Sequence, residues 1–476
     1  MATTATDTRL TPDLFKLLGV IMLGALMMQL DITMTTIATN TLLRDFHTTL
    51  STLQWVGTGY LLAMATVIPL AGWALERYGA RRMWMLTLTI FLAGSVLSAT
   101  SWSVAALIAF RVVQGVGAGM ILPLAQAILT MAAGPERLGR VMAAIGIPAL
   151  LGPVLGPVLG GLIVTDLSWR WIFLVNIPIC LIALVLSPRY LPNVRTPGSS
   201  SLDLLGLALL SPAFAALIYG FAEAGQKGSF TTFAVVGPEI AGLALLLAFG
   251  WHAVRLGSRA LIDLRLFRVR AFAASAGAIA TASGVMFGAL GLLPLYYQQI
   301  RAEDALHTGL LLIPFGIGMG VSLTIVGRLS DRLPPRPLAL AGLALSAAGA
   351  LAFTQLDAGT SYWLLGVAQL ASGAGVGGIL VPVMTAAMRG LTPDAIPRAS
   401  VAVRMFQQLG GSVGSAVLFV VLQREIASAD VAGAGSAFGS TFWWVVGFAA
   451  LTLLPAVLLP GTLRTQSGPE SAPAVP

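Results

Sequence analysis

Two charged side chains that stand alone in long apolar runs, Asp31 and Arg111, are the residues best suited to chemistry in this sequence. Asp31 lies about 21 Å along its run from Leu17, and Arg111 lies about 12 Å along its own from Ser103, at ~1.5 Å per helical residue. In antiparallel helices these depths are compatible. Desolvation favours a neutral acid and a nearby guanidinium favours its anion, so the two together could exchange a proton for a cation. The alternatives are a permanent structural ion pair and, for Arg111, a bond to backbone carbonyl groups.

The composition indicates that these runs cross a membrane. Apolar residues make up 57% of the chain, charged residues 10%, and the mean hydropathy is +0.88, whereas soluble domains carry about 25% charged residues. A helix spans a bilayer with about 20 apolar residues. We therefore expect an all-α integral membrane protein with fourteen spans, at roughly 17–41, 52–73, 83–101, 104–132, 138–164, 170–188, 203–223, 233–254, 271–297, 305–327, 337–356, 361–388, 398–424 and 439–460.

The second half of the chain repeats the first at an offset of 258 residues. The matching residues are Gly115, Gly117, Gly119, Arg140, Gly152 and Gly156 on Gly373, Gly375, Gly377, Arg398, Gly410 and Gly414. A repeated set of apolar helices indicates a duplicated membrane unit. The predicted parts are a tail at 1–16, a six-helix bundle at 17–188, a linker with two extra helices and a basic loop at 189–270, a second bundle at 271–460, and a disordered tail at 461–476.

The distribution of basic residues predicts the orientation. Twenty Lys and Arg residues fall on the side of the N-terminus, and five fall in the opposite loops. The positive-inside rule then puts both termini in the cytoplasm.

Several functions are not indicated by the sequence. It contains no Gly-Lys dipeptide and hence no P-loop for ATP, and its three histidines are scattered rather than grouped for a metal. The net charge of +8 is explained by loop placement, so no nucleic-acid partner is expected. Cys180 is the only cysteine, so no intrachain disulfide can form. We expect no enzyme activity and no cofactor.

Two short loops carry matching charges. Residues 72–82 read GWALERYGARR and residues 327–337 read GRLSDRLPPRP. An acid beside arginines can form charge-assisted bonds that latch helix ends in one conformation; plain topology is the alternative. We predict that Glu76 or Arg77 contacts the loop between the fourth and fifth helices, or the end of the eleventh, in an outward-facing state. The candidate latch residues are Gly72, Glu76, Arg77, Gly79, Arg81, Asp331 and Arg332.

Residues 72–82 resemble the signature between helices two and three of the major facilitator superfamily, with Glu76 where Asp is usual. Residues 111–115 (RVVQG) resemble its helix-four motif, and residues 152–161 (GPVLGPVLGG) its helix-five antiporter motif. Residues 30–33 (LDIT) and 169–178 (WRWIFLVNIP) narrow the resemblance to the fourteen-helix drug:proton antiporters. The resemblance implies two six-helix bundles plus two extra helices, and export rather than import.

The helix-five motif also has a physical interpretation. Gly152, Gly156 and Gly160 recur every four residues, which places them on one face where another helix can approach closely. Prolines at intervals along the same run can bend the helix or seal a pathway. Close packing alone is the alternative for the glycines. The motif residues are Gly152, Pro153, Gly156, Pro157, Gly160 and Gly161.

Polar and aromatic side chains in the spans are candidates for a central amphipathic cavity, although most such residues in any bundle are packing. These candidates are Gln29, Gln54, Gln126, Tyr296, Arg404 and Gln408. Arg404 could instead extend to the cytoplasm.

The sequence therefore predicts a proton-coupled exporter of amphipathic drugs or related small molecules, which works by alternating access with the proton gradient as its energy source. A dedicated exporter of one endogenous metabolite or self-made antibiotic, and a transport-inactive membrane sensor, are the alternatives. The expected setting is a bacterial-type cell membrane, with the protein as a monomer in the lipid bilayer.

Overall fold

The computed structural model describes residues 11–462, apart from 135, 193–200, 358 and 429–433, and these described residues are helical with short connections. The ends of the expected tails and most of the expected linker at 189–201 thus lie outside the described residues. In the first half the helices are α1 (Pro12–Ile37), α2 (Thr39–Asp45), α3 (Leu50–Val67), α4 (Leu70–Tyr78), α5 (Ala80–Ala99), α6 (Val104–Ala133), α7 (Leu138–Asp166), α8 (Arg170–Leu174) and α9 (Asn176–Tyr190).

A helical hairpin and a second set of helices follow. The hairpin is α10 (Leu204–Lys227) and α11 (Phe233–Leu256), with short 3-10 turns η1 (Gly257–Arg259) and η2 (Leu264–Arg268) after it. The second set is α12 (Arg270–Gln299), α13 (Ala305–Leu311), α14 (Ile313–Ser330), α15 (Pro335–Phe353), α16 (Tyr362–Met388), α17 (Ile396–Ser428) and α18 (Ala434–Val457).

Local chemistry sets several helix boundaries. The hydroxyl groups of Thr11 and Ser103 accept bonds from the first turns of α1 and α6, as N-caps do. The expected span 52–73 is broken into α3 and α4 with a bend of 56°, next to Pro69, which has no N–H to donate. Gly79 (φ 84°) then joins α4 to α5, in a backbone region that only glycine adopts without strain.

Within the described residues, twelve helices are long and apolar enough to cross a membrane, and the bent pair α3–α4 makes a thirteenth when it is counted as one span. The remaining expected span, 138–164, coincides with α7, of which Leu138–Pro148 counts as a shorter apolar helix. The fold is an all-α membrane fold with twelve to thirteen candidate spans.

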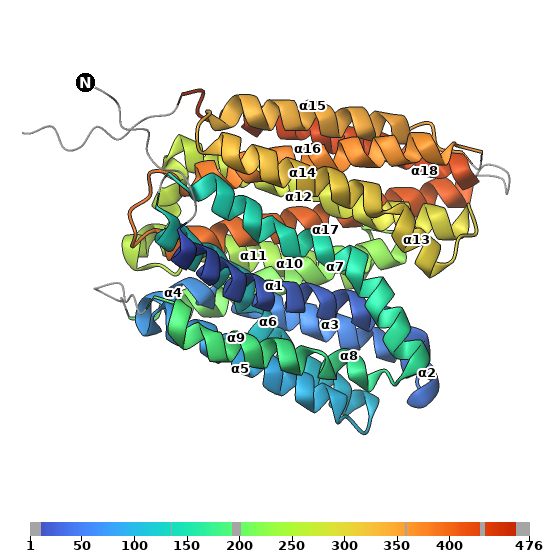
Figure 1. Cartoon of the computed structure of the whole chain (residues 1–476), viewed down its shortest axis with the longest axis horizontal. Helices are drawn as coiled ribbons and strands as arrows, with labels where there is room; N and C mark the ends of the chain where they lie inside the picture. The colour runs from blue at the N-terminus through green and yellow to red at the C-terminus, as the bar shows by residue number, and fades with distance from the viewer. Residues whose placement is uncertain (1–10, 135, 193–200, 358, 429–433, 463–476) are drawn as a thin grey trace, which may run out of the picture.

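The same helix contacts occur in both halves. The pairs α1–α7, α3–α6 and α5–α6 correspond to α12–α17, α14–α16 and α15–α16. Glycine permits this approach: a methyl group on Gly117 of α6 would lie 2.5 Å from the backbone nitrogen of Phe91 in α5. In Figure 1 the first set of helices (blue to green) lies below the second set (yellow to red), with α7, α10, α11 and α17 between their outer layers.

The two seams between the bundles differ. On one side α7 packs directly on α14. On the other side the repeat predicts the equivalent contact between α17 and α3, but α10 lies against both of these helices, and α17 meets the first bundle mainly at α4 and α6.

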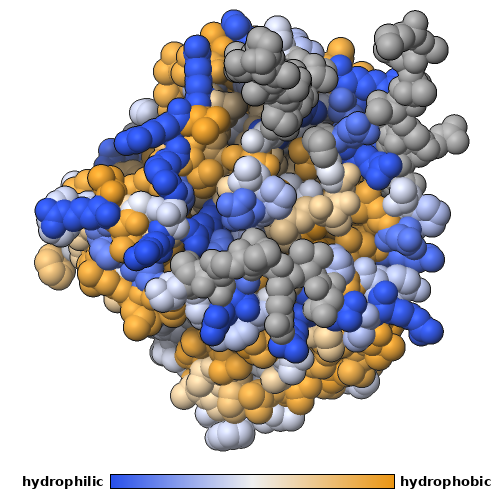
Figure 2. Space-filling view, turned by 90° about the vertical axis from the view of Figure 1, so that its left-hand side faces the viewer, coloured by the Kyte–Doolittle hydropathy of each residue, from blue (hydrophilic) through white to orange (hydrophobic). Residues whose placement is uncertain are grey.

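The start of α1, the end of α4 and the end of α11 lie at one end of the molecule, on the left in Figure 1. The start of α15 lies at the same end. The backbone N–H of Arg336 there donates to the carbonyl oxygen of Pro460, so Pro460 lies at this end too. Figure 2 shows this end face-on, with hydrophilic residues gathered across it and hydrophobic residues around the sides. We refer to it as the latch end.

Candidate functional site

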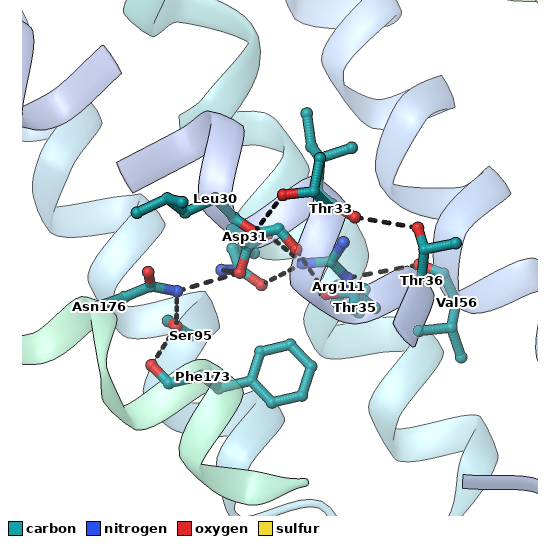
Figure 3. A network of polar contacts seen from close by, with 12 residues as sticks. Leu30, Asp31, Thr33, Thr35, Thr36, Val56, Ser95, Arg111, Phe173 and Asn176 are labelled. Carbon is teal, nitrogen blue, oxygen red and sulfur yellow. Dashed lines mark hydrogen bonds and ion pairs between the residues drawn. The ribbon is translucent and has the colours of Figure 1, made fainter. Parts of the chain in front are cut away.

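Asp31 and Arg111, which the sequence could not show to be in contact, form a buried ion pair. The exposed fraction is 0% for Asp31 in α1 and 1% for Arg111 in α6. The guanidinium Nη1 of Arg111 lies 2.5 Å from Oδ2 of Asp31. Figure 3 shows both side chains pointing into the space between α1, α6 and α9.

Two amides complete the surroundings of the Asp31 carboxylate. Gln114 Nε2 donates to Asp31 Oδ1 at 2.8 Å, and Asn176 Nδ2 of α9 donates to the same oxygen at 3.0 Å. Gln114 Oε1 in turn accepts from Arg111 at 2.9 Å. Asp31 thus accepts three bonds, and each of these partners presents a donor group to the carboxylate.

The network extends to α5. Asn176 also donates to Ser95 Oγ at 3.0 Å, and Ser95 donates to the carbonyl oxygen of Phe173 at 2.8 Å (Figure 3). Sequence reasoning did not select Gln114 or Asn176, although both lie inside the stretches that carried the family resemblance. The signal that could have identified them is a polar side chain within an otherwise largely apolar stretch of each motif.

Arg111 has further partners that hold its side chain. Its Cζ lies 4.0 Å from the centre of the Tyr60 ring in α3, in cation–π contact, and its Nε donates to the carbonyl oxygen of Val56 at 3.4 Å. Arg111 therefore links α3, α6 and α1, so both the ionic and the carbonyl-binding roles expected for it are present together.

The second bundle has no equivalent ion pair. At the offset of 258 residues Ala289 takes the position of Asp31 and Gln369 that of Arg111. Gln369 Nε2 donates to Tyr297 Oη at 2.8 Å and to the carbonyl oxygen of Leu311 at 2.9 Å. Among the described residues, a buried ion pair of this kind thus occurs in the first half only.

A cavity of about 210 Å³ reaches Arg111 from the end opposite the latch end. It is lined by the later turns of α1, by the start of α3 and by Arg111 itself, and Gln54 lies in this lining. We call it the Arg111 cavity. The cavity therefore extends from residues near that end to the guanidinium of Arg111.

At the latch end, Glu76 is held by the other bundle. Arg398 at the start of α17 donates from Nε and Nη2 to the two carboxylate oxygens of Glu76, each at 2.9 Å. Such two-point pairing is the strong geometry for arginine and carboxylate. Arg398 also donates to the carbonyl oxygen of Ser258, which ties the turn after α11 to the same contact.

Asp331 makes the reciprocal contact from the second bundle to the first. Its Oδ1 accepts from the backbone N–H of Gly139 at 2.7 Å, and its Oδ2 lies 3.5 Å from Nε of Arg140 at the start of α7. Burial raises the pKa of Asp331 to about 6, against the lowering effects of the Gly139 bond, Arg140 and Arg389.

The glycines of the two loops occupy matching positions. A methyl group on Gly72 would lie 3.2 Å from the carbonyl oxygen of Pro397, and one on Gly327 would lie 3.3 Å from that of Gly139. Pro397 and Gly139 are themselves equivalent in the repeat. Each bundle thus lays its loop glycine and loop acid against the same turn of the other bundle.

Glu76 contacts Arg398 at the start of α17 rather than the loop between the fourth and fifth helices or the end of the eleventh. The reason is that each half reaches the loop of the opposite half. Among the other latch candidates, Arg81 donates to the carbonyl oxygen of Leu191 at 3.0 and 2.8 Å, whereas Arg77 and Arg332 are exposed.

The glycine face of α7 lies against α1. A methyl group on Gly152 would come within 2.8 Å of Gln29 Cβ, one on Gly156 would overlap Thr33 Oγ1, and one on Gly160 would lie 3.2 Å from Met34 Cα. Gly161 points to open space. Thr33 also donates to the carbonyl oxygen of Gly152 at 3.2 Å. The side chains of Pro153 and Pro157 lie outside the described part of the structure.

The candidate cavity residues do not share one cavity. A central space of about 60 Å³ between the bundles is lined by Gln29, Gln126 and Arg404, among others. Arg404 donates to Gln407 at 2.8 Å there, which differs from an extension to the latch end. Gln408 lines a separate cavity. Tyr296 is buried in the second bundle, where its hydroxyl group donates to the carbonyl oxygen of Asp357 at 2.6 Å.

The chain resembles known transporters in sequence and in fold. The family model described as Major Facilitator Superfamily matches residues 21–415 and 289–475. A "Multidrug resistance protein B homolog" of Mycobacterium tuberculosis is 40% identical over 425 residues, covering 89% of this chain and 79% of the relative. A "Lincomycin resistance protein LmrB" of Listeria monocytogenes is 28% identical, covering 81% of each. The solved human organic anion transporter MFSD10 (TETRAN) superposes with a TM-score of 0.63 at 18% identity, covering 94% of this chain and 100% of the other.

Proposed function

Because this chain belongs to the major facilitator superfamily, and is a membrane transporter rather than an enzyme, we propose that it is a proton-coupled exporter of amphipathic drugs or related small molecules. The relatives named for multidrug and lincomycin resistance favour this substrate range. Alternating access between two six-helix bundles is the proposed mechanism.

The observation that carries the proposal is the buried pair of Asp31 and Arg111 beside the Arg111 cavity. Ionisable groups at membrane depth are costly and commonly mark proton or ion pathways. Asp31 is the proposed proton carrier. In this proposal, protons reach Asp31 by way of the Arg111 cavity, from the end opposite the latch end. The cavity is lined by Arg111, which binds Asp31.

Protonation of Asp31 would break the network that holds it. Arg111, Gln114 and Asn176 all donate to the Asp31 carboxylate. A proton bound to this carboxylate would need an acceptor, such as the amide oxygen of Gln114 or Asn176 after that side chain rotates. Arg111 would lose its charged partner at the same time. Because these residues lie on α1, α6 and α9, the proton changes how three helices of the first bundle are held together.

The latch contacts supply the second conformational element. Glu76–Arg398 and Asp331–Gly139 join the bundles at the latch end, so this conformation is closed there. Opening requires both to break. In the proposed cycle, loss of the proton from Asp31 and capture of substrate accompany the open state, and a proton from the opposite side accompanies release.

The proposal includes a topology. Fourteen spans, with α7 as the fifth and α10–α11 as the two extra helices, put both termini in the cytoplasm of a bacterial-type cell membrane, with the latch end on the cytoplasmic side. The bundles are 17–188 and 271–460, and the transporter acts as a monomer. The basic loop between α11 and α12 and the hydrophilic latch end support this orientation.

The test is transport by the purified chain in proteoliposomes with an imposed proton gradient, across a panel of amphipathic compounds. Efflux of several unrelated compounds, abolished when a protonophore collapses the gradient, is the expected result. Efflux of one compound alone would identify a dedicated exporter, and no gradient-driven movement of any compound would contradict the proposal.

A further inference from the structure

The largest of the cavities described here lies at the seam that α10 opens. It has a volume of about 420 Å³ and is lined by residues of α3, α10, α12 and α17. On the opposite seam the equivalent helices, α7 and α14, pack directly. α17 still contacts the first bundle at α4 and α6, but α10 lies between α17 and α3, and the hollow is at that place. We call this hollow the α10 cavity.

The hairpin is fixed in this position on both sides. Tyr219 of α10 stacks on Trp55 of α3, with ring centres 6.2 Å apart. At the other side, Gln423 of α17 donates to the carbonyl oxygen of Gly225 at 3.0 Å, and small residues of α10 and α17, Ala224 and Ala416, pack together. The cavity is thus a built part of the fold.

One face of α17 supplies most of the polar lining, and Gln226 of α10 adds one further polar side chain. Gln408, Ser412 and Ser415 recur at three- and four-residue intervals, which places them on one side of the helix. At the equivalent positions of α7, 258 residues earlier, stand Leu150, Val154 and Pro157. The second half therefore carries polar residues at positions where the first half has apolar ones.

These polar groups have no protein partner among the described residues: neither Gln408 nor Ser412 nor Ser415 makes a hydrogen bond there. All three side chains are half-buried and face the cavity, so their polar groups are available to a bound molecule. The remaining lining is apolar and aromatic, with Phe221, Phe287 and Phe419 around the same space. Apolar walls with a few polar groups, at a volume between roughly 300 and 1,000 Å³, are typical of small-molecule sites.

No charged side chain lines the α10 cavity. Its nearest connection to the charged network is Leu61 of α3, which lines both the α10 cavity and the Arg111 cavity. A molecule in the α10 cavity would therefore press on the helix that carries Tyr60, on whose ring Arg111 is stacked.

We propose that the α10 cavity is a substrate site for an uncharged amphipathic molecule with hydrogen-bonding groups, and that α10 of the extra hairpin forms one wall of this site. This rests on the proposed function and specifies its substrate class. The substrate binds through the aromatic walls and the Gln408, Ser412 and Ser415 side chains. Occupancy reaches the Asp31–Arg111 pair through α3 rather than by direct contact with a charge.

The experiment uses two variants that fill the cavity from different helices, Ala222→Phe in α10 and Ser415→Phe in α17. The matched control is Ala450→Phe at an exposed position of α18. The full chain in lipid nanodiscs is photolabelled with an uncharged benzyl alcohol diazirine, and adducts are mapped by mass spectrometry. We expect saturable labelling of residues 408–419 in the wild type and the control, reduced at least fivefold in both filled variants.

Transport measured on the same proteins separates this inference from the proposed function. Both filled variants should lose gradient-driven efflux of uncharged compounds in the panel, and the control should keep it. Saturable labelling without any efflux by the wild type would support the binding site and contradict the proposed export function. Wild-type labelling in both filled variants, or a phospholipid that copurifies with the wild type and is lost from Ala222→Phe, would overturn the substrate site.

Discussion

Arg111 donates a 2.5 Å hydrogen bond to Asp31, and these two side chains, 80 residues apart in the chain, are both closed off from solvent. A buried pair of this kind is a unit: removing one partner leaves an uncompensated charge, at a cost of about 3–5 kcal/mol. Loss of transport in a single variant therefore does not separate a proton carrier from a structural pair. Neutralising both residues does.

We expect Asp31→Asn to lose gradient-driven efflux and its dependence on external pH, and to lower the melting temperature because Arg111 is left unpaired. Asp31→Asn combined with Arg111→Gln, which puts at position 111 the residue type of its counterpart Gln369, should recover most of the thermal stability but not the efflux. Melting temperatures and efflux at external pH 5.5 and 7.5 measure both effects. If the double variant exports against a gradient with the wild-type pH profile, Asp31 is structural.

Glu76 and Arg398 lie 322 residues apart and join the two bundles. Hydrogen bonds to charged groups contribute about 1.5–3 kcal/mol, so Glu76→Gln should lower the ratio of closed to open molecules at the latch end about tenfold or more. The charge swap Glu76→Arg with Arg398→Glu should restore much of it. Spin labels on cysteines at the exposed positions 78 and 333 report the distance between the bundles. Arg82→Gln, an exposed change in the same loop, is the control. An unchanged distance in Glu76→Gln would leave the loop with a topological role only.

The latch should also respond to pH through Asp331. Burial in the closed latch raises its pKa to about 6 from the ordinary value of 3.8, while an open latch would return it to water. The closed state therefore binds the proton more tightly, so its added stability is full below about pH 4 and is lost as the pH rises through about 6. The same spin labels should report more closed latch at pH 5 than at pH 7.5. Asp331→Asn should reduce this difference, and a full wild-type response in that variant would assign the effect to another group.

The contact between α1 and α7 depends on Gly156. A methyl group there would overlap Thr33 Oγ1, whereas one at Gly161 meets nothing within 4 Å. Overpacking costs about 1–3 kcal/mol, so we expect Gly156→Ala to lower the melting temperature and the efflux rate. Gly161→Ala should leave both unchanged or raise stability slightly, since alanine favours a helix over glycine by about 1 kcal/mol. Equal behaviour of the two variants would show that the spacing of α1 and α7 does not depend on glycine at position 156.

The sequence alone determined the features that depend on local pattern. Long apolar runs, the 258-residue repeat and the placement of basic residues identify a duplicated helical membrane protein, because span length and hydropathy are properties of single segments. The depths of Asp31 and Arg111 followed from helical rise alone. The glycine spacing of 152, 156 and 160 predicted a face for close approach, and α1 is the helix that uses it.

Only the tertiary structure decided which residues meet. Gln114 and Asn176 bind Asp31 because α6 and α9 bring them to the same carboxylate, and nothing in either segment encodes that distance. Glu76 pairs with Arg398, not with the loop of its own half, because the two bundles face each other at the latch end. The separation of α3 from α17 by α10 likewise depends on how three distant helices pack. Such contacts are set by the relative placement of rigid helices, which a one-dimensional pattern does not contain.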